Sequence, residues 1–308
     1  MGVMNMGQFE ITFLGTTAGI PTKYRNHASI YIRYQAEQEF CCLFDCGEGT
    51  QKQIFSAGLN FMRIDDVFIS HWHADHFAGL LGLLETMNLE KRKDELRIYG
   101  PEASRFVSIL LSLGYGAKKF AVKAIDVEHD GTEIQTLLDN DEISVQSIPM
   151  KHSIPAVAYA VVEKDRVKIN KEKAKAMGLP ETGPLYKKLK DDGSVIFKDK
   201  KILLEDVSFL EYGKKVVYSG DTMPNKNIVK IAKNADLLIH DSTFFTEGDY
   251  VWHHAMFDEV IKIAEQAQAK KLVLTHISRR YPDFSELENK IKGMPNTVIA
   301  KDFMRVVV

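Results

Sequence analysis

The chain has 308 residues, of which 45% are hydrophobic and 27% charged, and its formal net charge is −2. This composition is typical of a soluble globular protein and excludes disordered, fibrous and membrane classes. No apolar run approaches the roughly 18 residues that a membrane-spanning helix needs. The first residues, MGVMNMGQ, do not combine a basic segment with an apolar core, so we expect neither a membrane anchor nor a secretory leader.

Short apolar strands alternate along the chain with amphipathic helices. Period-two alternation predicts half-buried strands over residues 9–13 and 30–34. Further strands are predicted by short runs rich in β-branched residues, namely FCCLFD, DVFIS, ISVQSI, AVAYAVV, KVVYS, DLLIH and KLVLT. Helices are predicted over FAGLLGLLETMNL and AMFDEVIKIAEQAQA, the second with an apolar face of Val260, Ile263, Ala264 and Ala267. This alternation indicates an α/β protein.

The three cysteines, Cys41, Cys42 and Cys46, lie close together at the end of one predicted strand. An odd number at this spacing does not indicate a disulfide framework. Small buried cysteines are common in apolar runs such as FCCLFD. Reduced, buried thiols favour a cytoplasmic protein.

Residues 163–213 interrupt the alternation, because apolar residues are sparse and Pro and Gly breakers are frequent. The sequence KEKAKAMG predicts a short helix closed by Gly178. From Glu163 to Leu203 there are twelve Lys or Arg and seven Asp or Glu, a net charge of +5, which leaves −7 for the remainder. We interpret the segment as an arm that projects from the main domain. Its charge indicates a polyanionic partner, and a solvated insertion of mixed charge is the alternative.

Polar residues of metal-ligand type stand where several predicted strands end. They are His71 after DVFIS, His152 after ISVQSI, Asp221 after KVVYSG, His240 and Asp241 at the end of DLLIH, and His276 after KLVLT. Sites in α/β proteins gather at strand ends, where loops converge over a rigid base. Packing alone does not explain five strands that each deliver His or Asp to one rim.

The central motif is HWHADH, which places His71, His73, Asp75 and His76 in a turn between a strand and a helix. His71 and His73 differ by two residues, so in extended backbone they point the same way. Asp75 and His76 follow in the turn and can face a second point. Four ligands in six residues can thus serve two adjacent metal ions.

The remaining ligands must come from distant segments, and His152, Asp221 and His276 are available. Asp221, in SGDT, is suited to bridge two ions. Two ions about 3.5–4 Å apart can hold a hydroxide and offset charge on a transferring phosphoryl group. The ligand set suits zinc, which ionises bound water near neutral pH. The pattern therefore predicts a two-metal hydrolase acting on a phosphodiester.

The motif HxHxDH with downstream His, Asp and His resembles the metallo-β-lactamase superfamily. Its members include thioesterases, lactamases, sulfatases and nucleases, so the fold alone leaves the function open. Seven segments together resemble the tRNase Z (RNase Z) family of tRNA 3′-processing endonucleases over residues 9–304. They are LGTTAGIPTKYRNHASI, FDCGEGTQKQI, FISHWHADHFAGLLGLL, GLPETGPLYKKLK, VVYSGDT, LLIHDSTF and LVLTHISRRY.

This resemblance implies a four-layer αββα sandwich that forms a single domain over residues 1–308, with residues 163–213 as an inserted flexible arm. The Gly-Pro motif in GPLYKKLK belongs, in the family, to an arm (exosite) that grips the tRNA elbow. The resemblance also implies a homodimer with two zinc ions per chain. The substrate is then precursor tRNA, cut to leave a 3′-hydroxyl on the tRNA and a 5′-phosphate on the trailer.

The resemblance further implies roles for individual residues. His71, His73 and His152 bind one zinc ion, Asp75, His76 and His276 bind the other, and Asp221 bridges them. Asp75 also accepts a proton from the attacking water. Asp45, in FDCGEGTQ, orients a histidine ligand. Arg25 and the run Arg279, Arg280 and Tyr281 are candidate phosphate or substrate contacts, with an ordinary surface position as the alternative.

A general acid is needed as well, because a ribose 3′-oxygen leaves only with a proton. His254 is our candidate, oriented by Asp241, because a histidine can donate near neutral pH. The adjacent His253 is the local alternative, and a structural role for both is another. The chain departs from the family here. It has His240-Asp241-Ser242-Thr243 for His-Glu-Ala-Thr, and His254-Ala255-Met256 where the family has His, then Ser or Met, then Thr.

Two other functions remain open. Another phosphodiesterase or an arylsulfatase-like hydrolase of the superfamily would act on small substrates and have no evident use for residues 163–213. A non-catalytic RNA-binding protein on the same scaffold would be expected to lose metal ligands, whereas all seven positions are present here.

Overall fold

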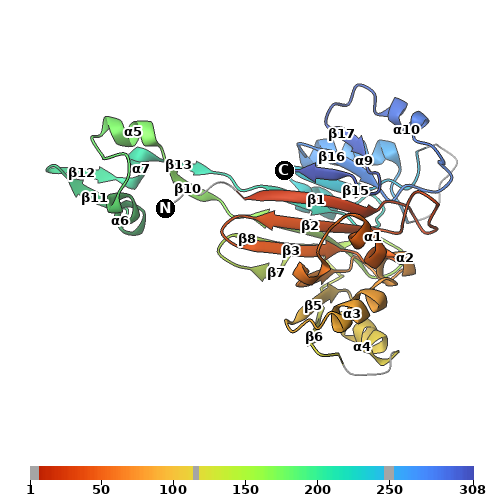
Figure 1. Ribbon diagram of the computed structural model, residues 1–308. Helices are drawn as coiled ribbons and strands as arrows, with labels where there is room; N and C mark the ends of the chain where they lie inside the picture. Colours follow the sequence, from red (N-terminus) through yellow and green to blue (C-terminus); the bar gives the residue numbers. More distant parts are fainter. Residues whose placement is uncertain (1–6, 114–117, 246–252) are drawn as a thin grey trace. The chain divides into compact units, whose positions relative to one another are not determined.

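The computed structural model describes residues 7–113, 118–245 and 253–308 (Figure 1). The chain divides into two compact units. Unit 1 comprises Met1–Val162 and Lys214–Val308, and unit 2 comprises Glu163–Gly213. Among the described residues, no helix combines the length and the apolarity needed to cross a membrane.

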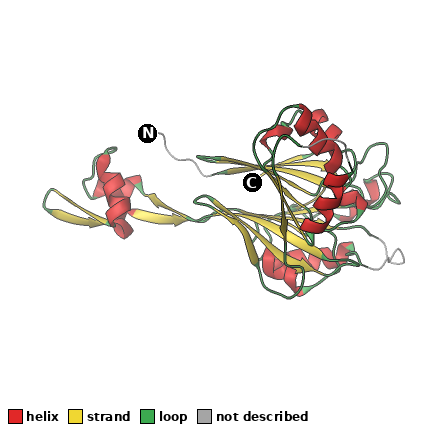
Figure 2. Cartoon of the chain, turned by 90° about the horizontal axis from the view of Figure 1, so that it is seen from below, coloured by secondary structure: helices red, strands yellow, loops and turns green. Residues whose placement is uncertain are grey.

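Two seven-stranded sheets form the centre of unit 1 (Figure 2). In spatial order, the first sheet contains β18 (Arg305–Val307), β1 (Gln8–Gly15), β2 (Ser29–Gln35), β3 (Glu39–Phe44), β4 (Asp66–Phe68), β5 (Leu96–Gly100) and β6 (Val122–Asp126). The second contains β17 (Thr297–Ile299), β16 (Leu272–Thr275), β15 (Leu237–Asp241), β14 (Lys215–Tyr218), β9 (Ala156–Glu163), β8 (Ile143–Met150) and β7 (Gln135–Asp139). Every strand predicted from an apolar run is present.

The inner faces of the two sheets share one apolar core. Phe44 of the first sheet packs against Tyr159 and Tyr218 of the second, and Phe68 packs against Tyr159, with ring centroids 5.3–5.7 Å apart. Because successive strand residues point to opposite faces, each sheet also presents an outer apolar face. Helices cover both outer faces (Figure 2). The order helix, sheet, sheet, helix confirms the predicted αββα sandwich.

The covering helices belong to two groups. Those associated with the first sheet are α1 (Thr50–Ser56), the 3-10 helix η1 (Phe61–Arg63), α2 (Ala74–Phe77), α3 (Leu80–Leu89) and α4 (Ala103–Ser112). Those on the second are α8 (Lys226–Ala232), α9 (Phe257–Ala267) and α10 (Ser285–Lys290).

The helix predicted over residues 77–89 is interrupted at Gly79. The Gly79 amide donates to the carbonyl of Cys46 at 2.9 Å, and a Cβ at Gly79 would lie 2.1 Å from the carbonyl oxygen of Gly47. The main chain therefore approaches the loop after β3 too closely for any side chain. This contact holds the HWHADH turn against the first sheet.

Parallel pairing gathers several strand ends at one edge of the second sheet. β14, β15 and β16 are parallel neighbours, so their carboxyl ends share that edge. Asp221 follows β14, Asp241 ends β15, and His276 follows β16. Topology thus brings together residues that lie as far as 55 positions apart in the sequence.

Unit 2 is a small fold with its own core. Its strands β10 (Arg166–Ile169) and β13 (Ser208–Glu211) pair, as do β11 (Ser194–Phe197) and β12 (Lys200–Leu203). Its helices are α5 (Lys171–Ala176), α6 (Pro184–Asp192) and α7 (Leu204–Val207). Buried apolar residues hold them together, namely Ala174, Leu179, Leu189, Val195, Ile202 and Val207. Gly178 follows α5 with φ 84°, so the predicted helix stop is confirmed.

Met256 lies at the N-cap of α9, the position where the family carries threonine. Its backbone is extended, with φ −91° and ψ 151°, as an N-cap requires. Glu259 accepts a hydrogen bond from the Met256 amide at 3.0 Å. A thioether is only a weak acceptor for the free amides of the first turn. Methionine in place of threonine at position 256 therefore affects the capping of α9 rather than the position of His254.

Substitution Met256→Thr should stabilise the protein, because a hydroxyl acceptor would cap the first turn of α9. We expect a gain of about 1 kcal/mol in the free energy of unfolding and a rise in Tm of about 2 °C. Calorimetry of Met256→Thr beside Met256→Ala measures this, since alanine changes the side chain without adding a cap. Equal Tm values for the two variants would contradict the capping role.

Candidate metal centre and active site

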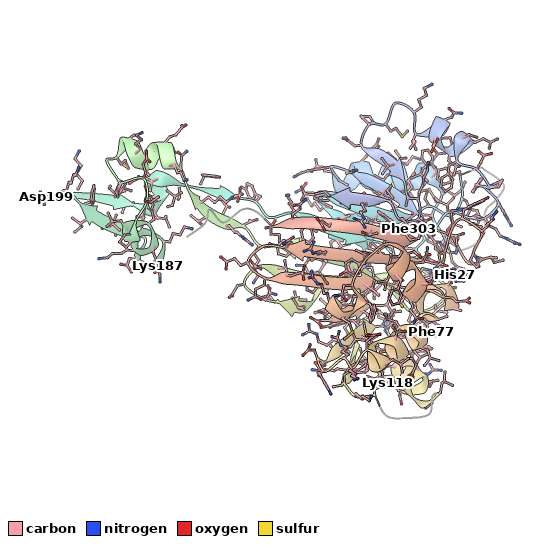
Figure 3. All side chains as sticks on the ribbon, viewed as in Figure 1. His27, Phe77, Lys118, Lys187, Asp199 and Phe303 are labelled. Carbon is pink, nitrogen blue, oxygen red and sulfur yellow. The ribbon has the colours of Figure 1, made fainter. Side chains whose placement is uncertain are left out.

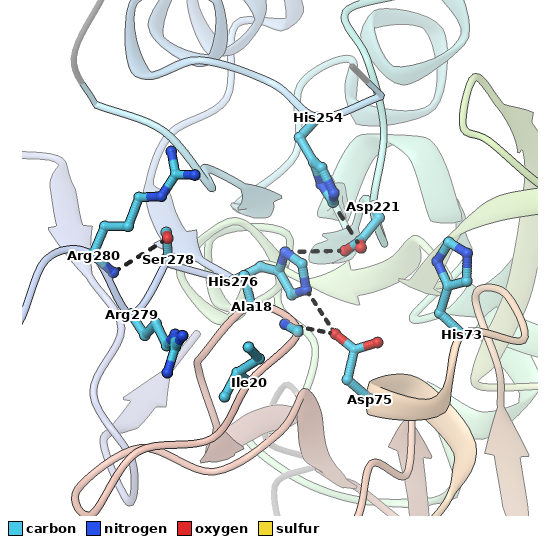
Figure 4. Close-up of a pocket in the computed structure, with 11 residues that line it drawn as sticks. Ala18, Ile20, His73, Asp75, Asp221, His254, His276, Ser278, Arg279 and Arg280 are labelled. Carbon is cyan, nitrogen blue, oxygen red and sulfur yellow. Dashed lines mark hydrogen bonds and ion pairs between the residues drawn. The ribbon is translucent and has the colours of Figure 1, made fainter. Parts of the chain in front are cut away.

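A cavity of about 380 Å³ opens at the rim of unit 1 where the strands end (Figure 4). Its lining includes His73, Asp75, Asp221, His254, His276, Arg279 and Arg280. These residues come from the HWHADH turn and from the loops after β14, β15 and β16. The structure thus brings together residues from both sheets around one cavity.

One cluster consists of His71, His73 and His152. The Nε2 atom of His71 lies 3.0 Å from Nδ1 of His73, which lies 3.2 Å from Nε2 of His152. Two ligand atoms of a tetrahedral zinc ion, each bonded at 2.0–2.1 Å, lie about 3.3 Å apart. The three nitrogens therefore have nearly the spacing that a single ion imposes.

A second cluster consists of Asp75, His76 and His276. The Nε2 atoms of the two histidines are 3.3 Å apart. Oδ2 of Asp75 lies 3.3 Å from Nε2 of His276 and 3.5 Å from Nε2 of His76. These distances also match the edge of a tetrahedral site.

The carboxylate of Asp221 lies between the two clusters. Its Oδ2 is 3.7 Å from Nε2 of His71 and 3.3 Å from Nε2 of His76. Its Oδ1 is buried, lies 3.4 Å from Nδ1 of His276 and has no hydrogen-bond partner among the described residues. A buried carboxylate oxygen without a donor is costly unless a cation neutralises it. The seven residues are thus compatible with a metal site.

The second ring nitrogen of four histidines is occupied by a support. Nδ1 of His76 donates to Asp45 Oδ2 at 2.7 Å, and Nδ1 of His152 donates to the carbonyl of His253 at 2.9 Å. Because Ser70 Oγ donates to Asp45, it accepts from Nδ1 of His71 at 3.0 Å. These contacts leave each Nε2 with its lone pair facing its cluster, as a metal ligand requires.

Thr243 supports His276 in the same way. Its hydroxyl donates to Asp241 at 2.6 Å and lies 3.0 Å from Nδ1 of His276. Asp45 and His276 both adopt left-handed backbone conformations, with φ 57° and 56°. Such conformations are unfavourable for residues other than glycine and gather at functional sites.

The charges of the site favour bound cations. Burial alone would lower the pKa of His276, but Asp221, with Asp241 and Asp75, raises it to about 10. Burial opposes a charge on His76 too, yet Asp221, Asp45 and Asp75 hold its pKa well above the usual range. Burial would raise the pKa of Asp221, but His276 and His76 keep it well below the usual range. The carboxylates therefore attract positive charge, which protons supply when no metal ion is bound.

His254 lies beside the second cluster, paired with Asp241. Its Nδ1 is 2.9 Å from Asp241 Oδ2 and 3.8 Å from Asp221 Oδ2. Burial would lower the pKa of His254, but the charge of Asp241 and its hydrogen bond raise it above the ordinary value. The ring of His253 does not line the cavity, and its carbonyl supports His152. The geometry therefore favours His254 over His253 as a proton donor.

Arg25 and Tyr281 have structural positions, unlike the substrate contacts or surface positions considered from the sequence. Both are buried, and the Arg25 guanidinium donates to the carbonyls of Ile277, Ser278 and Tyr281 at 2.9–3.2 Å. The Tyr281 hydroxyl accepts from the amide of Phe245 at 2.8 Å. Arg279 and Arg280 are exposed and line the cavity, so they remain candidate contacts.

Three supporting residues were not predicted from the sequence, and one polar residue was misplaced. Ser70 and Thr243 contact His71 and His276 directly, and Tyr218 donates to Asp45. The adjacency of Ser70 to His71 was the available signal. His240 precedes Asp241, the last residue of β15, and joins none of the ligand clusters of the described residues, whereas Asp241 contacts His254 and His276. It follows that only one of the two adjacent residues His240 and Asp241 reaches the site, as strand alternation requires.

Substitution Asp45→Asn should weaken metal binding by about 10–100-fold. One carboxylate oxygen accepts from the Ser70 main-chain amide and the other from His76, and an asparagine has a single oxygen for these two donors. Competition with a chelator measures the dissociation constants. Asp66→Asn is the matched control, since Asp66 is an equally buried carboxylate of the same sheet that pairs with Arg97. Equal metal affinity in the Asp45 variant and the parental protein would contradict this role.

Comparisons with known proteins agree with the fold. A family model described as Beta-lactamase superfamily domain matches residues 206–277, and one described as Anti-Pycsar protein Apyc1 matches residues 9–202. The crystal structure of human tRNase Z, short form, is 27% identical, with a TM-score of 0.67 over 96% of this chain and 98% of that chain.

Relatives match the chain from end to end. Ribonuclease Z of Archaeoglobus fulgidus is 41% identical and covers 97% of this chain and 98% of its own length. Ribonuclease Z of Methanosarcina acetivorans is 38% identical and covers 96% of this chain and 97% of its own length. The Apyc1 model, by contrast, ends within unit 2. The chain therefore belongs to the β-lactamase superfamily and, by its end-to-end relatives, to the ribonuclease Z family.

Proposed function

We propose that this chain is a zinc-dependent endoribonuclease that removes the 3′ trailer from precursor tRNA. The cut leaves a 3′-hydroxyl on the tRNA and a 5′-phosphate on the trailer. The observation that supports this most is the pair of ligand clusters joined by Asp221, beside the pair formed by His254 and Asp241. The end-to-end relatives named Ribonuclease Z supply the substrate class.

Two zinc ions would be held per chain. His71, His73 and His152 would hold one, Asp75, His76 and His276 the other, and Asp221 would bridge them. Zinc supplies a nucleophile at neutral pH and offsets charge that develops on the phosphate. The ligand types, imidazole and carboxylate, suit zinc better than the oxygen-only sites that magnesium and calcium prefer.

The chain's own residues move the protons. Asp75 is charged, because His76 and His276 outweigh its burial and hold its pKa well below the usual range. Its proposed role as acceptor of a proton from the attacking water rests on the resemblance to the family. His254, whose pKa is raised, donates a proton to the departing ribose 3′-oxygen. Asp241 orients the ring and stabilises its charge from 2.9 Å.

Arg279 and Arg280 would hold phosphate groups of the substrate at the mouth of the cavity. Both are exposed and belong to the loop after His276. A guanidinium offers several donors in a fork that matches phosphate oxygens. Arg280 also lies over the ring of Phe244 at 5.9 Å, which limits the directions in which its side chain extends.

Unit 2 would be a flexible exosite for the body of the tRNA. Residues 163–203 carry a net charge of +5, although three further acidic residues reduce the whole unit to +2. The twelve basic residues are spread from Lys164 to Lys201 and would bind phosphates of the tRNA. A homodimer in the cytoplasm is part of the same proposal, by resemblance to the family and from the free, buried cysteines.

Cleavage of an end-labelled precursor tRNA tests the proposal. We expect a single cut just past the 3′ end of the mature tRNA, with products that carry the 3′-hydroxyl and 5′-phosphate. Chelator treatment should abolish the cut and added Zn²⁺ should restore it. Hydrolysis of small phosphodiesters without any cut in the tRNA would favour the alternative function, a superfamily hydrolase of small substrates.

Removal of unit 2 should separate binding of the tRNA from the chemistry. Val162 of β9 lies opposite Lys215 of β14 in an antiparallel pair. An Asn-Gly turn can therefore replace residues 163–214 and close a two-residue hairpin. The truncated protein should keep its metal ions and its hydrolysis of a nitrophenyl phosphodiester but lose cleavage of precursor tRNA. Processing at the parental rate would rule out the exosite.

Substitution His254→Ala should slow cleavage of precursor tRNA by about 10²-fold or more, the usual effect of losing a general acid. Metal content should stay unchanged. A nitrophenyl phosphodiester should be far less affected, because its leaving group departs without a proton. His253→Ala is the control. Equal losses on both substrates would assign His254 to support of the site instead.

A further inference from the structure

The main chain of Gly19 contacts the carboxylate of Asp75. The Gly19 amide donates to Asp75 Oδ2 at 2.9 Å, and Figure 4 shows this link between Ala18 and Ile20. The same oxygen faces His276 and His76 at 3.3 Å and 3.5 Å. The Asp75 side chain is only 12% exposed, and the Gly19 amide and Nε2 of His276 contact the same carboxylate oxygen (Figure 4).

Gly19 itself is held in place by His27. The His27 side chain is buried, and its Nε2 lies 3.2 Å from the carbonyl oxygen of Gly19. A carbonyl oxygen only accepts hydrogen bonds, so Nε2 carries the proton and donates. Nδ1 is then a bare acceptor, and it has no partner in the described part of the chain. Among the described residues, the His27 ring, labelled in Figure 3, therefore makes only the hydrogen bond to Gly19.

Gly47 brings His27 close to the turn that carries Asp75. A Cβ at Gly47 would lie 2.2 Å from the carbonyl oxygen of Asp75 and 2.5 Å from Cβ of His27. Glycine therefore allows His27 and the Asp75 main chain to pack against the same residue. This packing and the Gly19 hydrogen bond connect His27 to Asp75 by two separate routes.

We propose that His27 is a positioning residue for Asp75, acting through Gly19. His27 fixes the Gly19 carbonyl, and the amide of the same residue then holds Asp75 at its productive orientation. Gly19 has φ 59°, and a Cβ built there would meet no atom within 4 Å, so hydrogen bonds rather than side-chain packing fix its conformation. The consequence for metal binding rests on the proposed function, in which Asp75 is a ligand of the second ion.

The expected effect is confined to one of the two ions. Without the His27 hydrogen bond, the segment around Gly19 fluctuates and Asp75 loses its amide donor for part of the time. Loss of support behind a ligand weakens metal binding by about 10–100-fold. The ion at His71, His73 and His152 should keep its affinity, because the side chains that hydrogen-bond Gly19 in the described structure are those of Asp75 and His27.

Two matched variants test this inference. His27→Gln places an amide donor at the position of Nε2, whereas His27→Met has the same length and no donor. Hydrogen exchange of the Gly19 amide, followed in the metal-free protein, should speed up about tenfold or more in His27→Met and stay near the parental rate in His27→Gln. Zinc titration should then show weaker binding of one ion only, in His27→Met alone.

Equal exchange rates in the two variants, or equal weakening of both ions, would overturn the positioning role of His27. A parental protein that binds no zinc while Gly19 exchange still depends on the donor at position 27 would contradict the proposed function instead. In that case His27 would still position Asp75 through Gly19, but Asp75 would not be a metal ligand. The exchange measurement thus separates failure of this inference from failure of the metal centre.

Discussion

The carboxylate of Asp221 is buried between two clusters of histidines, and the arrangement of the site depends on it. Its Oδ2 lies within 3.7 Å of one His71 and one His76 nitrogen, each from a different cluster. A buried carboxylate needs opposite charge close by. Protonated His76 and His276 provide that charge in the metal-free protein, and metal ions would provide it in the proposed enzyme. Either way, the second cluster and Asp221 stabilise one another.

Two buried aspartates, Asp45 and Asp241, hold the histidine ligands in fixed positions relative to the sheets. Asp45, after β3 of the first sheet, accepts from the Tyr218 hydroxyl of β14 in the second sheet at 2.7 Å. The same carboxylate supports His76 directly and His71 through Ser70. Asp241 supports His276 through Thr243 and contacts His254 directly. An aspartate in place of the family's glutamate at position 241 thus still reaches both histidines.

The sequence predicted the strands well, because apolar periodicity is a local signal. It also pointed to seven His and Asp residues near strand ends that the structure brings together in adjacent clusters. Sequence-based prediction failed where the burial or the contacts of a residue depend on segments distant in the sequence. The first strand was predicted half-buried, yet Thr12 is buried because helix α1 covers that face. Arg25 seemed available to substrate, yet loop 277–281 takes up its donors. The core of unit 2 was missed, because its few apolar residues lie scattered along the segment and converge only in the fold.

Anomalous scattering at the zinc edge from crystals of the zinc-loaded protein tests the two-metal site most directly. We expect two peaks per chain about 3.5–4 Å apart, with Asp221 between them. One peak should lie among His71, His73 and His152 and the other among Asp75, His76 and His276. A single peak, or a peak held by His254 and Asp241, would contradict the account.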